Sequence, residues 1–168
     1  MDADAEFEQY VADSYARLCR TGFLLCGDWQ RAEDAAQETL LKMHRSWARI
    51  ARHEGLDAYA RQTLVRTLID EWRRPWRRHE HVADDLPEGR STPRDATAQI
   101  DDRAQLVRAV SLLAPRQRAC VVLRFYLDVS VAETATTLGC SEGNVKRLTS
   151  DGLAALRCVL DTTEGSLT

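Results

Sequence analysis

Arginine and aromatic side chains alternate along residues 58–79, a combination that could bind a single nucleic-acid strand. The run reads AYARQTLVRTLIDEWRRPWRRH, and its six arginines are Arg61, Arg66, Arg73, Arg74, Arg77 and Arg78. Guanidinium groups contact phosphates, and stacking a base on an aromatic ring is worth about 1–3 kcal/mol. Since unstacking one base step costs roughly a few kcal/mol, such a surface could hold a strand that has left its duplex. The alternative is a solvated, arginine-rich helix end with Trp72 in the core beside Leu68.

Residues 130–156 form a second candidate for nucleic-acid binding, because their small residues are typical of a helix-turn-helix. Ala135 lets two helices approach closely, Gly139 suits a turn that needs a positive φ, and Val145 faces back onto the first helix. The expected capping residues of the two helices are Ser130 and Ser141. Such a unit places its second helix in a DNA major groove, whereas the alternative is an αα-hairpin within a helical bundle.

One face of the helix expected over residues 29–50 is polar and separate from its apolar face. Four residues at helical spacing define it: Asp34, Gln37, Glu38 and Leu41. Spacing alone favours an ordinary solvated face. A second interpretation makes it a docking face for another helical protein, with Leu41 as the apolar anchor. The residue pattern leaves both interpretations open.

Catalytic and metal-binding sets are not expected in this chain. The histidines are His44, His53, His79 and His81, and we expect the last two to be solvated in a linker rather than to bind a metal. The sequence contains neither a glycine-rich phosphate loop nor the nucleophile elbow G-x-S-x-G. We therefore expect no cofactor and no enzymatic activity.

The cysteine pattern and the hydropathy indicate where the protein works. Five cysteines, none in a C-x-x-C pair, fit reduced and mostly buried thiols in a cytosolic protein. Acidic residues follow Met1, where a signal peptide would carry a basic and then an apolar run. No apolar run approaches membrane-spanning length. The sequence thus predicts a soluble, cytoplasmic protein without membrane insertion.

Helices must position these residues, because no segment alternates apolar and polar residues long enough to form a strand. The 168 residues are 44% hydrophobic, enough for the cores of one or two small domains. Residues 1–78 carry 13 Lys/Arg and 13 Asp/Glu, residues 79–102 carry 2 and 7, and residues 103–168 carry 8 and 6. An acidic connector therefore separates two nearly neutral lobes.

We expect an all-α fold of two small helical domains joined by a flexible acidic linker. The first domain covers residues 1–78, the linker 79–99 and the second domain 100–168. The expected helices cover about 4–25, 29–50, 57–75, 100–113 and 115–127, followed by the helix-turn-helix, whose second helix ends near Leu156.

Local signals set the ends and the core of these helices. Gly27 ends the first helix, and Asp28 and Asp57 are the expected caps of the next two. Pro115 fits the first position of its helix. The residues expected to supply core after Pro115 are Val121, Val122, Phe125 and Tyr126.

The order of these segments resembles the RNA polymerase sigma factors of the extracytoplasmic-function group, in the style of actinobacterial members. The segment GDWQRAEDAAQETLLKMHRSW (27–47) is similar to the family's polymerase-binding segment. The segment LAPRQRACVVLRFYLDVSVAETATTLGCSEGNVKRL (113–148) is similar to its C-terminal DNA-reading domain. The resemblance extends from about Phe7 to Leu160. It implies a promoter-specificity subunit that binds core polymerase and promoter DNA, and it allows an anti-sigma factor as a further partner.

The resemblance also implies residue roles. Asp34, Gln37, Glu38 and Leu41 would dock on the coiled coil of the β′ clamp. The melted minus-ten element would be held by Arg61, Arg66, Trp72, Arg73, Arg74, Arg77 and Arg78. The acidic linker would thread toward the RNA exit channel. The C-terminal domain would sit on the β flap and read the minus-thirty-five element through Ser141, Glu142, Asn144, Lys146, Arg147 and Ser150.

The recognition helix departs from the family pattern. Members usually continue after the lysine as Ser-Arg-x-x-Arg, whereas Lys146 is followed here by Arg147 and Leu148, with Asp151 at the last basic position. Asp151 lies one turn beyond Arg147, so we expect it to pair with that arginine and withhold it from DNA. Arg66 stands where members often have Asn. Two other functions stay open: a helix-turn-helix regulator that never enters the polymerase, and a sigma-like interaction protein with reduced DNA reading.

Overall fold

The computed structural model describes residues 2–52, 54–73 and 97–165 of the chain, without side chains for residues 72, 73, 97–102 and 163–165. The chain divides into two compact units, residues 1–83 and 84–168. Helices make up all the regular structure among the described residues, as expected for an all-α fold.

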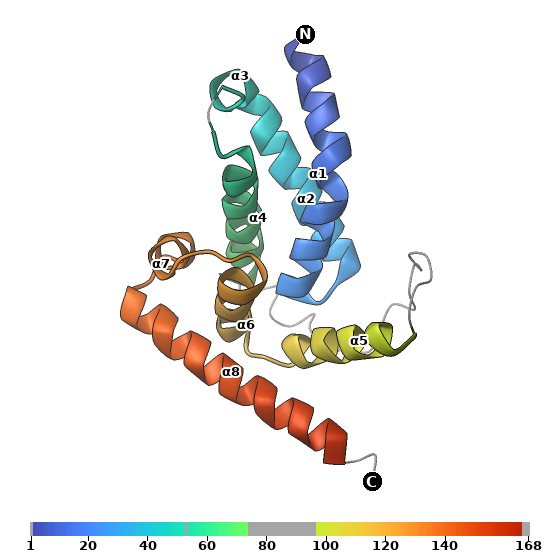
Figure 1. The fold of residues 1–168 in the computed structure, drawn as a ribbon. Helices are drawn as coiled ribbons and strands as arrows, with labels where there is room; N and C mark the ends of the chain where they lie inside the picture. The colour runs from blue at the N-terminus through green and yellow to red at the C-terminus, as the bar shows by residue number, and fades with distance from the viewer. Residues whose placement is uncertain (1, 53, 74–96, 166–168) are drawn as a thin grey trace. The chain divides into compact units, whose positions relative to one another are not determined.

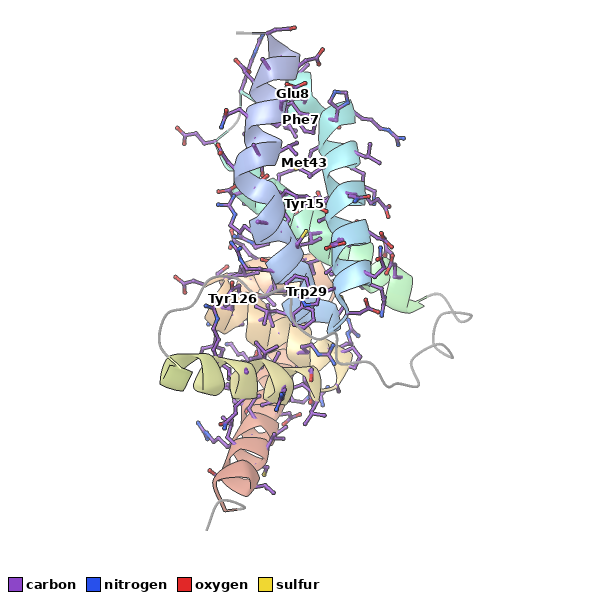
Figure 2. The ribbon with its side chains drawn as sticks, turned by 90° about the vertical axis from the view of Figure 1, so that its right-hand side faces the viewer. Phe7, Glu8, Tyr15, Trp29, Met43 and Tyr126 are labelled. Atoms are coloured by element: carbon purple, nitrogen blue, oxygen red, sulfur yellow. The ribbon has the colours of Figure 1, made fainter. Side chains whose placement is uncertain are left out.

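The first unit is built from α1 (Ala3–Cys26), α2 (Trp29–Arg45), α3 (Trp47–Ile50) and α4 (Leu56–Arg73). The helices α1, α2 and α4 lie side by side and contact one another (Figure 1). Met43 and Leu64 are fully buried in this bundle, and Figure 2 shows Met43 between α1 and α2. The apolar face predicted for residues 29–50 is confirmed as buried, at Ala32, Ala36 and Met43 of α2 and at Trp47 and Ile50 of α3.

The turn from α1 to α2 follows the predicted local chemistry. Gly27 adopts a left-handed conformation with φ 74°, and its N–H donates to the carbonyl of Phe23 at 2.7 Å. The Asp28 carboxylate accepts from the backbone N–H of Arg31 at 3.1 Å, which caps α2. A Cβ on Gly22 would lie 3.2 Å from the Cα of Ala32, so the two helices approach closely just before the turn.

Two predictions for the first unit are wrong. The helix expected over residues 29–50 is interrupted at Ser46, whose φ of −110° and ψ of 6° separate α2 from α3. Asp57 does not cap α4 but lies inside its first turn, where its carboxylate accepts from the Arg17 guanidinium of α1 at 2.6 Å. The first hydrogen bond at the start of α4 is between main-chain groups: the N–H of Tyr59 donates to the carbonyl of Gly55 at 3.0 Å.

The second unit contains α5 (Thr97–Ser111), α6 (Pro115–Val121), a π-helical turn η2 (Val122–Tyr126), α7 (Val131–Leu138) and α8 (Glu142–Gly165). The N-terminal half of α8 crosses α7, and α8 also packs on α5 and α6 (Figure 1). Pro115 occupies the first turn of α6, as predicted. The last helix is longer than expected, because it continues past Leu156 to Gly165.

Arginines of the second unit hold the ends of its helices together. The Arg118 guanidinium donates to the carbonyls of Ser111 at 2.6 Å and Leu113 at 3.1 Å, where α5 ends. Arg116 donates to the carbonyl of Leu138 at the end of α7, at 3.2 Å. These contacts supply donors to carbonyls that a helix terminus leaves without partners. Part of the basic charge in this unit therefore stabilises the fold.

The prediction that Phe125 and Tyr126 belong to the core is wrong, since they are 62% and 50% exposed. The preceding Val121 and Val122 are buried as expected. The difference arises at η2, where the N–H of Leu127 donates to the carbonyl of Val122 five residues earlier, at 3.0 Å. This wider turn changes the direction in which the following side chains point.

Several predicted segments lie outside the described residues. They include most of the predicted linker over 79–99, although its last residues, 97–99, open α5 rather than a linker. Of the predicted minus-ten residues, Arg74, Arg77 and Arg78 lie outside the described residues, and Trp72 and Arg73 are described by their backbone alone.

Candidate functional site

The four predicted docking residues Asp34, Gln37, Glu38 and Leu41 are all exposed, and together we name them the α2 surface. Leu41 is 60% exposed, on a helix whose opposite side is buried. The Asp34 and Glu38 carboxylates lie on the same face, on the N-terminal side of Leu41. The α2 surface therefore combines an apolar anchor with negative charge, which suits a basic helical partner.

Aromatic side chains border the α2 surface on the side of α1. Trp29 stacks on Phe23 with ring centroids 4.3 Å apart and remains 37% exposed. Figure 2 shows Tyr15 and Trp29 along the face where α1 and α2 meet. The hydrogen bond with Gln37 lowers the pKa of Tyr15. Burial and the neighbouring Cys19 thiol together raise this pKa by more than the hydrogen bond lowers it, so the net shift is upward. Tyr15 is thus a neutral phenol beside the α2 surface.

Polar contacts border the α2 surface on the side of α4. The Lys42 ammonium lies 2.9 Å from the Glu38 carboxylate and 3.1 Å from the Thr67 hydroxyl. Nearer the start of α2, the Arg31 guanidinium lies 3.4 Å from the Glu71 carboxylate, and these side chains are 16% and 15% exposed. Lys42 is not among the residues predicted from the sequence, although its i,i+4 spacing from Glu38 is a signal for such a pair.

The arginines of α4 do not all share one face. Arg66 is exposed, and Tyr59 lies seven residues before it, about 20° away around the helix. The backbone places residue 73 on this same face, seven residues after Arg66. Arg61 is half-buried and lies about 140° from Arg66, because five residues separate them. Tyr59, Arg66 and position 73 therefore lie along one face of α4 at intervals of about 10 Å, and Arg61 lies off that face.

The helix-turn-helix has the predicted capping geometry. The Ser130 and Ser141 hydroxyls accept from the backbone N–H groups of Glu133 and Asn144, each at 3.1 Å. Gly139 ends α7 in a left-handed conformation with φ 62°. Val145 is fully buried, so one side of the first turns of α8 packs against the protein, and the opposite side, which we call the open side of α8, is exposed to solvent.

The open side of α8 and the Ser141 cap before it carry the predicted reading residues. Ser141, Glu142, Lys146, Arg147 and Ser150 are exposed, and Asn144 is half-buried. Arg147 donates to the Asn144 side-chain oxygen at 2.8 Å and lies 3.9 Å from the Asp151 carboxylate. The predicted pairing of Arg147 with Asp151 is confirmed, and the contact with Asn144 adds a second restraint.

Cys120 supports the helix-turn-helix from inside. Its thiol is fully buried, and burial, with a smaller contribution from the nearby Cys140, raises the pKa of Cys120 to about 11. The group is therefore an uncharged core side chain at neutral pH. The cysteines are free thiols, of which Cys19, Cys26 and Cys120 are buried.

Within the described parts of the chain, no cluster of three metal-ligating side chains occurs. None of the described helices is both long and apolar enough to cross a membrane.

Comparison with known proteins assigns both units to one family. Residues 8–78 match Sigma-70 region 2, and residues 103–156 match Sigma-70 region 4. The RNA polymerase sigma-E factor of Streptomyces coelicolor is 39% identical over 153 residues, which cover 90% of this chain and 84% of that protein. The ECF RNA polymerase sigma factor SigL of Mycobacterium tuberculosis is 33% identical over 168 residues, covering 94% and 91%.

Solved structures agree on the fold. The sigma factor RpoE of Bartonella quintana, solved in complex with the anti-sigma factor NepR, aligns with a TM-score of 0.71 at 19% identity over 93% of this chain and 97% of that one. CnrH, solved with the cytosolic domain of CnrY, aligns with a TM-score of 0.62 at 18% identity, covering 95% and 90%. With the sequence matches to both sigma regions, the chain belongs to the sigma-70 family of RNA polymerase sigma factors, in its extracytoplasmic-function group.

Proposed function

We propose that this sigma factor docks on core RNA polymerase through the α2 surface, holds the separated minus-ten strand with residues 58–78 and reads the minus-thirty-five element with α8. In this proposal residues 1–78 are the polymerase-binding and minus-ten domain, and residues 100–168 are the minus-thirty-five domain. The acidic segment 79–99 joins them. The protein performs no catalysis itself and acts in the cytoplasm, where an anti-sigma factor is a further partner.

The exposed α2 surface is the observation that carries the proposal. Leu41 is 60% exposed among three polar residues that neighbour it on the helix, and it indicates docking through its grouping with further exposed apolar area on the same unit. Tyr15 and Trp29 extend the same surface with aromatic area, the residue type that most often anchors protein interfaces. These features favour the docking interpretation over the ordinary solvated face.

The α4 face supports the minus-ten assignment. Tyr59 and Arg66 are placed to offer an aromatic ring and a guanidinium along one side of a helix that leads into the arginine-rich run. Arg61 lies about 140° from Arg66 around α4, so we expect it to contribute less to binding the minus-ten strand than the family resemblance implies.

Run-off transcription with core polymerase on a selected promoter library tests the proposed function. A sigma factor yields discrete transcripts that require both the core enzyme and this chain. A regulator that never enters the polymerase binds DNA without supporting such transcripts. A sigma-like interaction protein binds core enzyme and selects no promoter.

Because Asp151 and Asn144 both contact Arg147, we expect substitution of Asp151 to change the proposed minus-thirty-five contact. Asp151→Arg should tighten promoter binding severalfold, because it removes a charge that repels phosphates, frees Arg147 and adds a cation. Lys146→Ala should weaken binding, since it removes an exposed cation from the same face. Titration of the holoenzymes on duplex carrying the upstream element, at fixed salt, measures both.

Weaker binding by Asp151→Arg would mean that Asp151 itself contacts DNA, for example by accepting from a cytosine amino group. If neither substitution changes binding, α8 does not read DNA, and the interaction-protein alternative takes precedence.

A further inference from the structure

Lys42 lies between the α2 surface and the helix assigned to the minus-ten strand. Its ammonium is 2.9 Å from the Glu38 carboxylate, which belongs to the α2 surface, and 3.1 Å from the Thr67 hydroxyl of α4. Thr67 is 3% exposed, so it is a fixed anchor point rather than a mobile surface group. One side chain therefore links the two surfaces that the proposed function uses.

The two contacts of Lys42 differ in what docking would do to them. Glu38 is half-exposed and would face a basic partner, whereas Thr67 is buried and would keep its place. An exposed i,i+4 ion pair in water is weak, because solvent and salt screen it. A partner cation that is desolvated in an interface can therefore draw the Glu38 carboxylate away from Lys42.

Lys42 would then carry an uncompensated positive charge beside α4. Thr67 directly follows Arg66, and its position lies about 100° from Arg66 around the helix, at the border between the buried side and the exposed face. An ammonium held there can reach a phosphate of a strand lying along that face. In the free protein the Glu38 carboxylate offsets this charge.

We propose that Lys42 is a coupling residue, which Glu38 neutralises in the free protein and which contacts the promoter backbone once Glu38 engages the polymerase. The inference rests on the proposed docking of the α2 surface. Because coupling between two binding events is reciprocal, promoter DNA should strengthen the hold on core polymerase by the same factor.

Lys42→Met tests the coupling, because it removes the ammonium and keeps a long side chain. The probe is a promoter fragment with a pre-melted minus-ten region, titrated at several salt concentrations with the full-length protein alone and with its holoenzyme. In the holoenzyme, the slope of log affinity against log salt should become shallower by about 0.7, the value of one single-strand phosphate contact. In the free protein, the slope should be unchanged.

Two matched variants separate charge from packing. Lys42→Arg keeps the charge and should retain the holoenzyme slope. Thr67→Val removes the anchoring hydroxyl with little change in shape, and it should give part of the Lys42→Met effect.

An equal change in the free protein and the holoenzyme would overturn the coupling, since Lys42 would then be an ordinary DNA contact. No change in either would make it only a structural tie between α2 and α4. Both of those results leave the proposed function intact, provided that Glu38→Arg still prevents core binding. If Glu38→Arg leaves core binding unchanged, the docking assignment fails first.

Discussion

Replacing Glu38 by arginine should weaken binding to core RNA polymerase by about 100-fold or more. The substitution places a cation where the α2 surface offers a carboxylate, and juxtaposed like charges in an interface cost several kcal/mol. The fold should survive, because Glu38 is exposed and the buried side of α2 points the other way. A binding titration of the full-length protein with core enzyme measures the loss, and circular dichroism checks the helical content.

Asp13→Arg is the matched control for this experiment. Asp13 is also an exposed carboxylate of the first unit, but it lies on α1, where its contact is with Gln9. The two variants change the net charge equally, so a general electrostatic effect would weaken both. Specific docking weakens only Glu38→Arg, and equal losses would refute the α2 surface as the docking site.

Adding a methyl group to Gly152 should destabilise the second unit by about 1–3 kcal/mol. Its Cβ would lie 2.8 Å from a methyl carbon of Val121 and 3.4 Å from Gln117, where α8 crosses α6. Val121 is a buried, β-branched side chain with little freedom at χ1, so it cannot turn aside cheaply. Hydrogen exchange of the α6 and α8 amides after Gly152→Ala measures the free energy of opening in this unit alone.

Two companions make the Gly152 prediction specific. Gly143→Ala lies on the same helix with open space around it, so it should be neutral or stabilise by up to about 1 kcal/mol through helix propensity. Val121→Ala removes the methyl group that collides, so the double variant should lose clearly less stability than the sum of the single variants. Additive losses would show that α6 and α8 do not approach closely at this point.

Local capping chemistry could be predicted from the sequence, because it depends on residues within one turn of each other. Ser130, Gly139 and Ser141 act as expected, and so do Gly27 and Asp28. The serines and Asp28 accept a hydrogen bond from a backbone N–H three residues later, and the two glycines adopt the positive φ at which a helix ends. The exposed α2 surface and the open side of α8 follow the same logic, since helical spacing sorts residues onto faces.

The failures at Asp57, Phe125 and Tyr126 involve a distant partner or a change of helical winding. Asp57 looks like a cap in sequence, but Arg17 lies 40 residues earlier and takes its carboxylate. Phe125 and Tyr126 have core spacing only for an uninterrupted α-helix, which η2 replaces. Lys42 meets Thr67 across two helices, and no local pattern announces that contact. The spacing of residues along one helix does not show which side chains of other helices will contact them.

The packing of the first unit has a consequence for how the protein is made. The contacts that join α1, α2, α3 and α4 all connect segments within the first 73 residues. This unit can therefore fold on the ribosome as soon as α4 has emerged, before α8 has been translated. At about 5–20 residues per second, the rest of the chain takes roughly 5–20 s to synthesise. During the later part of that interval the nascent chain already presents the α2 surface, so the proposed docking on the polymerase can begin before α8 has been made.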